Sequence, residues 1–168
     1  MEQKETQPPK HTIAALVDNE PGVLSRLAGL FSGRGFNIES LCVAETMEPE
    51  VSRITLTTRG NEQVIEQITK QLNKMVNVIK VMDLTGTEFV EREMALVKVR
   101  ADAASRAEIL RIVDIFRCKV VDVSPRFYVV EITGADEKIK AILSLLKNFG
   151  IKEIARTGAI AMARSKKE

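Results

Sequence analysis

The order of apolar segments repeats along the chain, and this repeat limits the fold more than any other feature. Residues 12–84 carry strand and helix patterns in the order strand, helix, strand, strand, helix, strand. Residues 93–160 carry the same order a second time. A βαββαβ unit forms a four-stranded antiparallel sheet with both helices on one face. The sequence therefore predicts an α+β protein of two ferredoxin-like βαββαβ units in tandem.

The boundaries of the two units follow from turn residues and from changes in periodicity. Strands are expected at residues 12–17, 36–44, 52–58 and 76–84 of the first unit and at 93–100, 120–123, 127–132 and 151–160 of the second. Helices are expected from about residue 20 to 32, from 61 to 75, and at 105–116 and 135–149. The predicted domains are a disordered extension at 1–10, a first domain at 11–85, a linker at 86–92, a second domain at 93–164 and a tail at 165–168.

Each predicted sheet leaves one face and its edge strands uncovered. Edge strands present unpaired backbone groups, and pairing with a second copy of the chain is the simplest way to satisfy them. We therefore expect a homodimer that is joined near the strand at residues 36–44.

The turn between the first strand and the first helix is the candidate binding site. Asn19 suits a helix N-cap, Pro21 suits the first helical turn, and Gly22 has no side chain to obstruct a ligand. Free N–H groups at a helix start bind carboxylates. The amides of Asn19 and Asn37 can donate to a carboxylate and accept from an ammonium group, as an amino acid requires. On these features alone, a simple capped helix and a ligand site both explain the turn.

Composition excludes several classes of function. The 168 residues carry a net charge of +2 from interleaved signs, which gives no general basis for binding nucleic acid or a membrane. No apolar run reaches membrane-spanning length and the start is polar, so a cytoplasmic protein is expected. His11 is the only histidine, and Cys42 and Cys118 lie far apart. We therefore expect neither a metal site nor histidine-based catalysis.

Several strings of residues resemble one known family. The turn Asp18-Asn19-Glu20-Pro21-Gly22-Val23-Leu24 within a βαββαβ unit resembles that of an ACT domain, an amino-acid-sensing regulatory module. The longer string that continues to Arg34-Gly35-Phe36-Asn37-Ile38-Glu39-Ser40-Leu41 is similar to the small regulatory subunit of acetohydroxyacid (acetolactate) synthase. The same family is also resembled by two further strings, Val90-Glu91-Arg92-Glu93 and Ile115-Phe116-Arg117. The resemblance covers about residues 11–164.

The resemblance implies a non-catalytic regulatory subunit in branched-chain amino acid biosynthesis. Such a subunit activates a large catalytic subunit, which carries thiamine diphosphate, magnesium and FAD, and it confers feedback inhibition by valine. No catalytic residue and no cofactor are expected on this chain. Valine would lie between the ACT domains of a homodimer, where it would contact Asn19, Gly22, Val23 and Leu24 of one chain and Asn37 and Ile38 of the other.

The second unit departs from the pattern at the corresponding turn. Its residues Ala101-Asp102-Ala103-Ala104-Ser105 lack both the amide and the glycine of the first unit. We expect no equivalent effector site there, and instead a role in dimer packing or in completing the assembly.

Three other functions remain to be weighed. An ACT-domain sensor could regulate a different metabolic enzyme. An RNA-recognition motif shares the order of elements, but among the strands that would stack bases only Phe127 and Tyr128 are aromatic. An enzyme would need paired carboxylates, and the candidates are Glu48 with Glu50 or Asp18 with Glu20. The string Gly33-Arg34-Gly35 resembles part of a dinucleotide-binding motif. Its glycines end a helix, however, whereas those of a dinucleotide-binding motif stand at the start of one.

Overall fold

The computed structural model describes residues 8–165 and divides into two compact units. Residues 8–90 and 160–165 form the first unit, and Glu91–Ala159 form the second. No helix within the described range is long and apolar enough to span a membrane.

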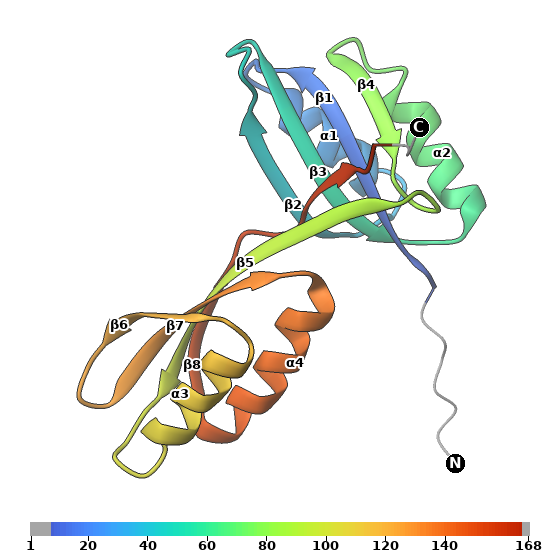
Figure 1. Cartoon of the computed structure of the whole chain (residues 1–168). Helices are drawn as coiled ribbons and strands as arrows, with labels where there is room; N and C mark the ends of the chain where they lie inside the picture. The colour runs from blue at the N-terminus through green and yellow to red at the C-terminus, as the bar shows by residue number, and fades with distance from the viewer. Residues whose placement is uncertain (1–7, 166–168) are drawn as a thin grey trace, which may run out of the picture. The chain divides into compact units, whose positions relative to one another are not determined.

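The first unit has the predicted βαββαβ order (Figure 1). Its elements are β1 (Lys10–Asp18), α1 (Val23–Ser32), β2 (Ile38–Glu45), β3 (Val51–Arg59), α2 (Glu62–Leu72) and β4 (Val78–Asp83). The strands form one antiparallel sheet in the order β2-β3-β1-β4, so β2 and β4 are its edges.

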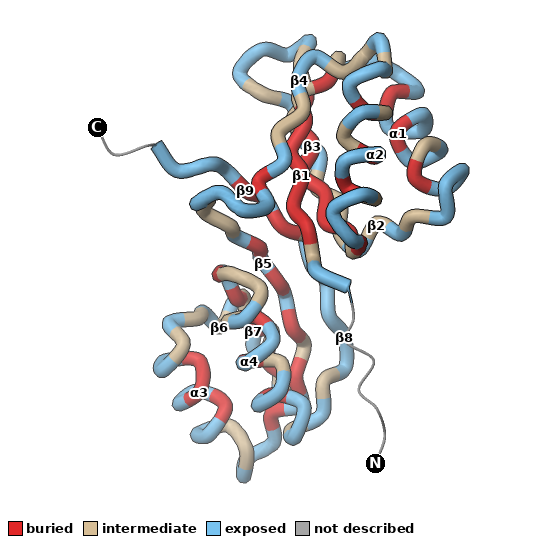
Figure 2. Tube along the Cα trace, turned by 90° about the vertical axis from the view of Figure 1, so that its right-hand side faces the viewer, coloured by how far each residue is buried: buried red, intermediate tan, exposed pale blue. Residues whose placement is uncertain are grey.

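Alternation along β1 explains how this sheet packs. Ile13, Ala15 and Val17 are buried against the apolar stripes of the two helices, which include Leu27 and Phe31 of α1. β1 is buried along most of its length (Figure 2), as a central strand should be. The α2 helix begins where predicted, because the side chain of Asn61 accepts a hydrogen bond from the Val64 N–H at 2.9 Å.

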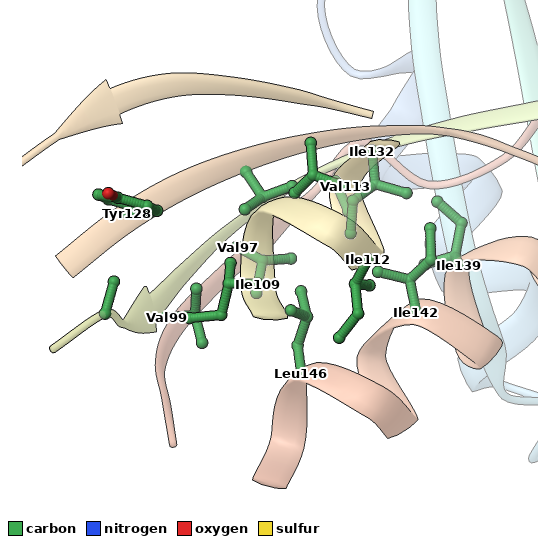
Figure 3. Close-up of a cluster of buried hydrophobic side chains, with 13 residues drawn as sticks. Val97, Val99, Ile109, Ile112, Val113, Tyr128, Ile132, Ile139, Ile142 and Leu146 are labelled. Atoms are coloured by element: carbon green, nitrogen blue, oxygen red, sulfur yellow. The ribbon is translucent and has the colours of Figure 1, made fainter. Parts of the chain in front are cut away.

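The second unit repeats the order. Its elements are β5 (Phe89–Arg100), α3 (Arg106–Ile115), β6 (Lys119–Val123), β7 (Phe127–Gly134), α4 (Asp136–Leu146), a 3-10 turn (Lys147–Phe149) and β8 (Ile151–Arg156). The sheet order is β6-β7-β5-β8. Side chains of β5 and β7 pack against both helices in a core of aliphatic residues and Tyr128 (Figure 3). The prediction of two ferredoxin-like units is confirmed.

The predicted linker and the last strand differ from the structure. Residues 89–92 of the expected linker already belong to β5. The single strand expected at 151–160 is instead β8 and a separate strand, β9 (Ile160–Ala163), divided near Gly158, whose φ is +78°. A left-handed residue interrupts an extended strand.

Strand β9 lies in the first compact unit, although its residues fall within the second domain predicted at 93–164. It pairs with β5, and Ala161 packs against Ala14 and Leu84 on the face of the first sheet that the helices leave open. The guanidinium of Arg53 donates to the carbonyl of Ala161 at 2.7 Å.

The start of the chain also differs from the prediction. Lys10, assigned to a disordered extension, is the first residue of β1. His11 is buried, and its ring nitrogens lie 3.1 Å from Thr85 Oγ1 and 3.0 Å from the carbonyl oxygen of Gly60. Residues 1–7 of the predicted extension and 166–168 of the predicted tail lie outside the described range.

Candidate functional site

The turn that leads into α1 is built around Gly22. This glycine is the N-cap, with φ +88° and ψ −11°, and the helix begins at Val23. The prediction of Asn19 as the N-cap is therefore wrong. The left-handed conformation of Gly22 redirects the chain, so that Asn19 and Pro21 lie in the turn and not in the helix.

The start of α1 has no side-chain cap. The N–H of Arg26 donates to the Gly22 carbonyl at 3.0 Å, but within residues 8–165 the N–H groups of Leu24 and Ser25 have no hydrogen-bond partner. A Cβ added at Gly22 would meet nothing within 4 Å. Open space thus lies beside two free donors at the positive end of a helix dipole, which is the chemistry that binds a carboxylate.

Asn19 is held by the hairpin between β2 and β3. Its backbone N–H donates to Glu50 O at 2.7 Å, and its side-chain Nδ2 donates to Pro49 O at 2.8 Å. The side-chain oxygen of Asn19 has no partner in the described residues and remains an acceptor for an ammonium group.

The neighbouring apolar residues differ in what they can contribute. Val23 is 3% exposed and packs in the core, so only its backbone can face a ligand. Leu24 is 43% exposed and offers apolar surface at the same turn.

A polar network behind the turn was missed by the sequence analysis. Asn77 donates from Nδ2 to Asp18 Oδ2 at 3.0 Å and to Glu20 Oε2 at 3.4 Å. Its Oδ1 accepts from the Arg26 guanidinium at 2.6 Å, and its carbonyl accepts from the Asp18 N–H at 2.9 Å. No local pattern around Asn77 signals this role, because its partners come from a distant part of the sequence.

Asn37 and Ile38 lie at the opposite end of the sheet from Asn19. The end of β1 pairs with Val51 at the start of β3, whereas Ile38 pairs with Thr58 near its end. These two positions on β3 are about 23 Å apart at 3.3 Å per residue. One chain therefore does not bring the two predicted halves of the site together.

The corresponding turn of the second unit is closed by its own carboxylate. Asp102 Oδ1 accepts from the Ser105 N–H at 3.0 Å and from the Ser105 hydroxyl at 2.8 Å. These hydrogen bonds from Ser105 lower the pKa of Asp102 below its ordinary value. A negative charge therefore occupies the place that a ligand carboxylate would need.

The features of the other functions are accounted for structurally. Glu48 and Glu50 are exposed in the β2–β3 hairpin, and no group of three or more metal-ligating side chains occurs among the described residues. Tyr128 packs in the second core, with the Arg106 guanidinium 6.0 Å from its ring centre. Of the two aromatic residues that could have stacked a base, Tyr128 is thus engaged in packing and Phe127 is half-buried.

Family models match both units. The model described as AHAS small subunit-like ACT domain matches residues 13–80, and that described as small subunit of acetolactate synthase matches residues 92–165. The first unit is therefore an ACT domain, whose fold and helix-start turn are those described above.

Relatives match over nearly the whole chain. A probable acetolactate synthase small subunit of Methanothermobacter thermautotrophicus is 55% identical over 161 residues, covering 95% of this chain and 96% of the relative. The acetolactate synthase small subunit of Aquifex aeolicus is 53% identical over 156 residues, covering 92% and 81%. The crystal structure of the small subunit from Thermotoga maritima superposes with a TM-score of 0.87 at 45% identity, covering 94% and 99%.

The chain belongs to the acetolactate synthase small subunit family, the regulatory and not the catalytic component of that enzyme.

Proposed function

We propose that this chain activates the thiamine-diphosphate-dependent catalytic subunit of acetolactate synthase and confers feedback inhibition by valine. The chain itself contributes no catalytic group, and thiamine diphosphate, magnesium and FAD belong to the catalytic subunit. Valine binds at the α1 turn through Asn19, Gly22, Val23 and Leu24 of one chain and through Asn37 and Ile38 of a second chain.

The observation that carries this proposal is the uncapped start of α1. The free N–H groups of Leu24 and Ser25 receive the carboxylate, and Gly22 leaves space for it. The side-chain oxygen of Asn19 accepts from the ammonium group. The exposed part of Leu24 supplies apolar surface for a small aliphatic side chain.

The edge position of β2 supports a site shared between two chains. When two β2 edges pair antiparallel about a two-fold axis, the start of one β2 lies beside the end of the other. The end of β2 leads into the hairpin that holds Asn19, through Pro49. A two-fold dimer therefore brings Asn37 and Ile38 of one chain toward Asn19 and Gly22 of the other. Within a single chain the two groups are about 23 Å apart.

Regulation then follows from differential binding. Without valine the dimer holds the catalytic subunit in its active arrangement, and valine stabilises a form of the dimer that does so less well. Couplings of this kind are about 1–3 kcal/mol, or roughly 5- to 150-fold in affinity. Partial inhibition at saturating valine is the expected behaviour.

A calorimetric titration with L-valine tests the site. A hydrogen bond to a charged ligand group contributes about 1.5–3 kcal/mol, so Asn19→Ala is expected to weaken valine binding about ten- to a hundredfold. Activation of the catalytic subunit by Asn19→Ala without valine should persist, because the substitution removes an exposed side chain and its hydrogen bond to Pro49, while the backbone hydrogen bond to Glu50 still holds the turn.

Asp102→Ala is the matched control, because it removes a polar side chain from the equivalent turn of the second unit. It should leave valine affinity unchanged, and D-valine and L-glutamate should not bind the unmodified chain. Normal valine binding by Asn19→Ala, or a clear loss in Asp102→Ala, would show that the site is assigned to the wrong turn.

A further inference from the structure

A basic hollow lies on the first unit beside the turn that enters α1. It has a volume of about 430 Å³ and is formed by α1, the residues that follow it and the segment between α2 and β4. The residues that line it are Arg26, Leu30, Arg34, Lys74, Met75, Val76 and Asn77.

Three positively charged residues line this hollow, Arg26, Arg34 and Lys74. Within residues 8–165 none of them forms a direct ion pair, but Arg26 shares the amide of Asn77 with Asp18 and Glu20, whose carboxylates partly offset its charge. Arg34 and Lys74 have no such neighbour among the described residues, because the ion pairs of this unit use Arg59 and Lys70. Like charges that gather without a counter-charge raise the local positive potential. The hollow is therefore suited to a partner that brings negative charge.

The centre of the hollow is apolar. Leu30 and Met75 pack partly against the core of the unit, while Val76 is 96% exposed at the rim. An exposed aliphatic residue framed by arginines is typical of a protein interface, where Arg and Met are enriched and charged rims surround apolar contacts. A small inorganic anion would use the charges and leave the apolar surface without a function.

We propose that this hollow is a docking site for an acidic segment of the catalytic subunit, with an apolar residue that covers Val76. The inference rests on the proposed function, since it takes the catalytic subunit as the partner. The guanidinium groups of Arg26 and Arg34 pair with carboxylates of that segment, and the ammonium group of Lys74 adds a third contact.

The hollow is connected to the effector turn through Arg26 and Asn77. The Arg26 N–H donates to the Gly22 carbonyl, and the Arg26 guanidinium donates to Asn77, which in turn holds Asp18 and Glu20. A carboxylate that binds at the start of α1 thus acts on the same helix turn that presents Arg26 to the catalytic subunit. Docking and effector binding are coupled, and by linkage the coupling is reciprocal.

The test is the double variant Arg34→Glu with Lys74→Glu in the full chain, titrated against the catalytic subunit. Both residues are exposed, so the fold should be retained, and normal valine binding by calorimetry checks this. The affinity for the catalytic subunit is expected to fall at least about tenfold, because attractive charge pairs become repulsive. The unmodified complex should also weaken more steeply with added salt than the variant complex.

The matched control is Lys80→Glu with Lys152→Glu, which changes the net charge equally at exposed positions away from the hollow. The docking site would be overturned if the test variant bound the catalytic subunit with unchanged affinity. It would also be overturned if the control variant lost as much affinity as the test variant. A third outcome would also overturn the docking site: the test variant binds the catalytic subunit normally, but phosphate no longer raises its melting temperature as it does that of the unmodified chain. That result would identify a small-anion site. If the unmodified chain does not bind the catalytic subunit at all, the proposed function fails as well.

Discussion

Gly22 shows how a single residue can determine a binding turn. Its φ of +88° is a left-handed conformation, which costs a residue with a Cβ about 1–2 kcal/mol. Since nothing lies within 4 Å of an added Cβ, the cost of Gly22→Ala is conformational and not steric. We expect this variant to lose about 1 kcal/mol of unfolding free energy and to bind valine more weakly.

Gly29→Ala is the control for that measurement by urea denaturation. Gly29 lies inside α1 without a positive φ, and an added Cβ there would also meet nothing within 4 Å. Alanine inside a helix is more favourable than glycine by about 0.5–1 kcal/mol. The two substitutions should therefore shift stability in opposite directions, and equal shifts would contradict the role assigned to Gly22.

The ion pair between Glu93 and Arg156 is the most buried one described in the second unit. Arg156 donates to the two carboxylate oxygens of Glu93 at 2.5 and 2.8 Å, and hydrogen bonding to Glu93 raises the pKa of Arg156 above its ordinary value. Glu93 is buried, whereas Arg156 is 39% exposed in its side chain. Removal of the arginine would leave a buried carboxylate without its main partner.

Arg156→Met is therefore expected to destabilise the second unit by about 1–3 kcal/mol at pH 7. Urea denaturation measures this loss, and an unchanged free energy of unfolding in Arg156→Met would show that the ion pair does not stabilise the unit.

Among the secondary-structure elements, strand β2 matters most for assembly because it is an uncovered edge of the first sheet. Val43 on this strand is an exposed aliphatic residue. A lysine on an edge strand opposes pairing with a second edge, since two copies would bring like charges together. Val43→Lys should therefore give a monomer by sedimentation, with loss of valine binding because the proposed site needs both chains.

The other edge of the same sheet provides the control. Ile79 on β4 is also an exposed aliphatic residue, and Ile79→Lys should leave the dimer intact. A dimer that survives Val43→Lys but dissociates with Ile79→Lys would move the interface to β4.

For the whole molecule, the main finding is that strand β9, which follows the second unit in sequence, packs on the first unit. Ala161 of β9 is 4% exposed and packs against Ala14 and Leu84, so a larger side chain there would have to displace these neighbours. Overpacking of such a position costs about 1–3 kcal/mol. We expect Ala161→Leu to accelerate amide exchange of β9 and of Arg164, which follows it, about five- to a hundredfold while β7 is unaffected.

Ala163→Leu is the matched control, because Ala163 is exposed on the same strand. It should leave exchange of β9 unchanged. Faster exchange in both variants, or in β7 as well, would mean that β9 is not specifically held by the buried contact of Ala161.

Local chemistry was sufficient to predict most of the fold. Alternation in β1, the helical stripe through Leu27 and Phe31, and the cap at Asn61 each act between residues close in sequence. The repeat of the element order then led to the topology. The boundaries were less accurate, because the start of α1 depends on the conformation of Gly22, and not on the capping preference of Asn19.

The sequence by itself determined the two βαββαβ units and the turn at Gly22, because periodicity and backbone preference are short-range properties. The tertiary structure alone decided that β9 packs on the first unit, that Asn77 joins Asp18 to Arg26, and that Asn37 lies far from Asn19. These features depend on contacts between distant segments. No local pattern of residues encodes which distant side chain will satisfy a hydrogen bond or fill a space, since that depends on how the sheet and helices pack.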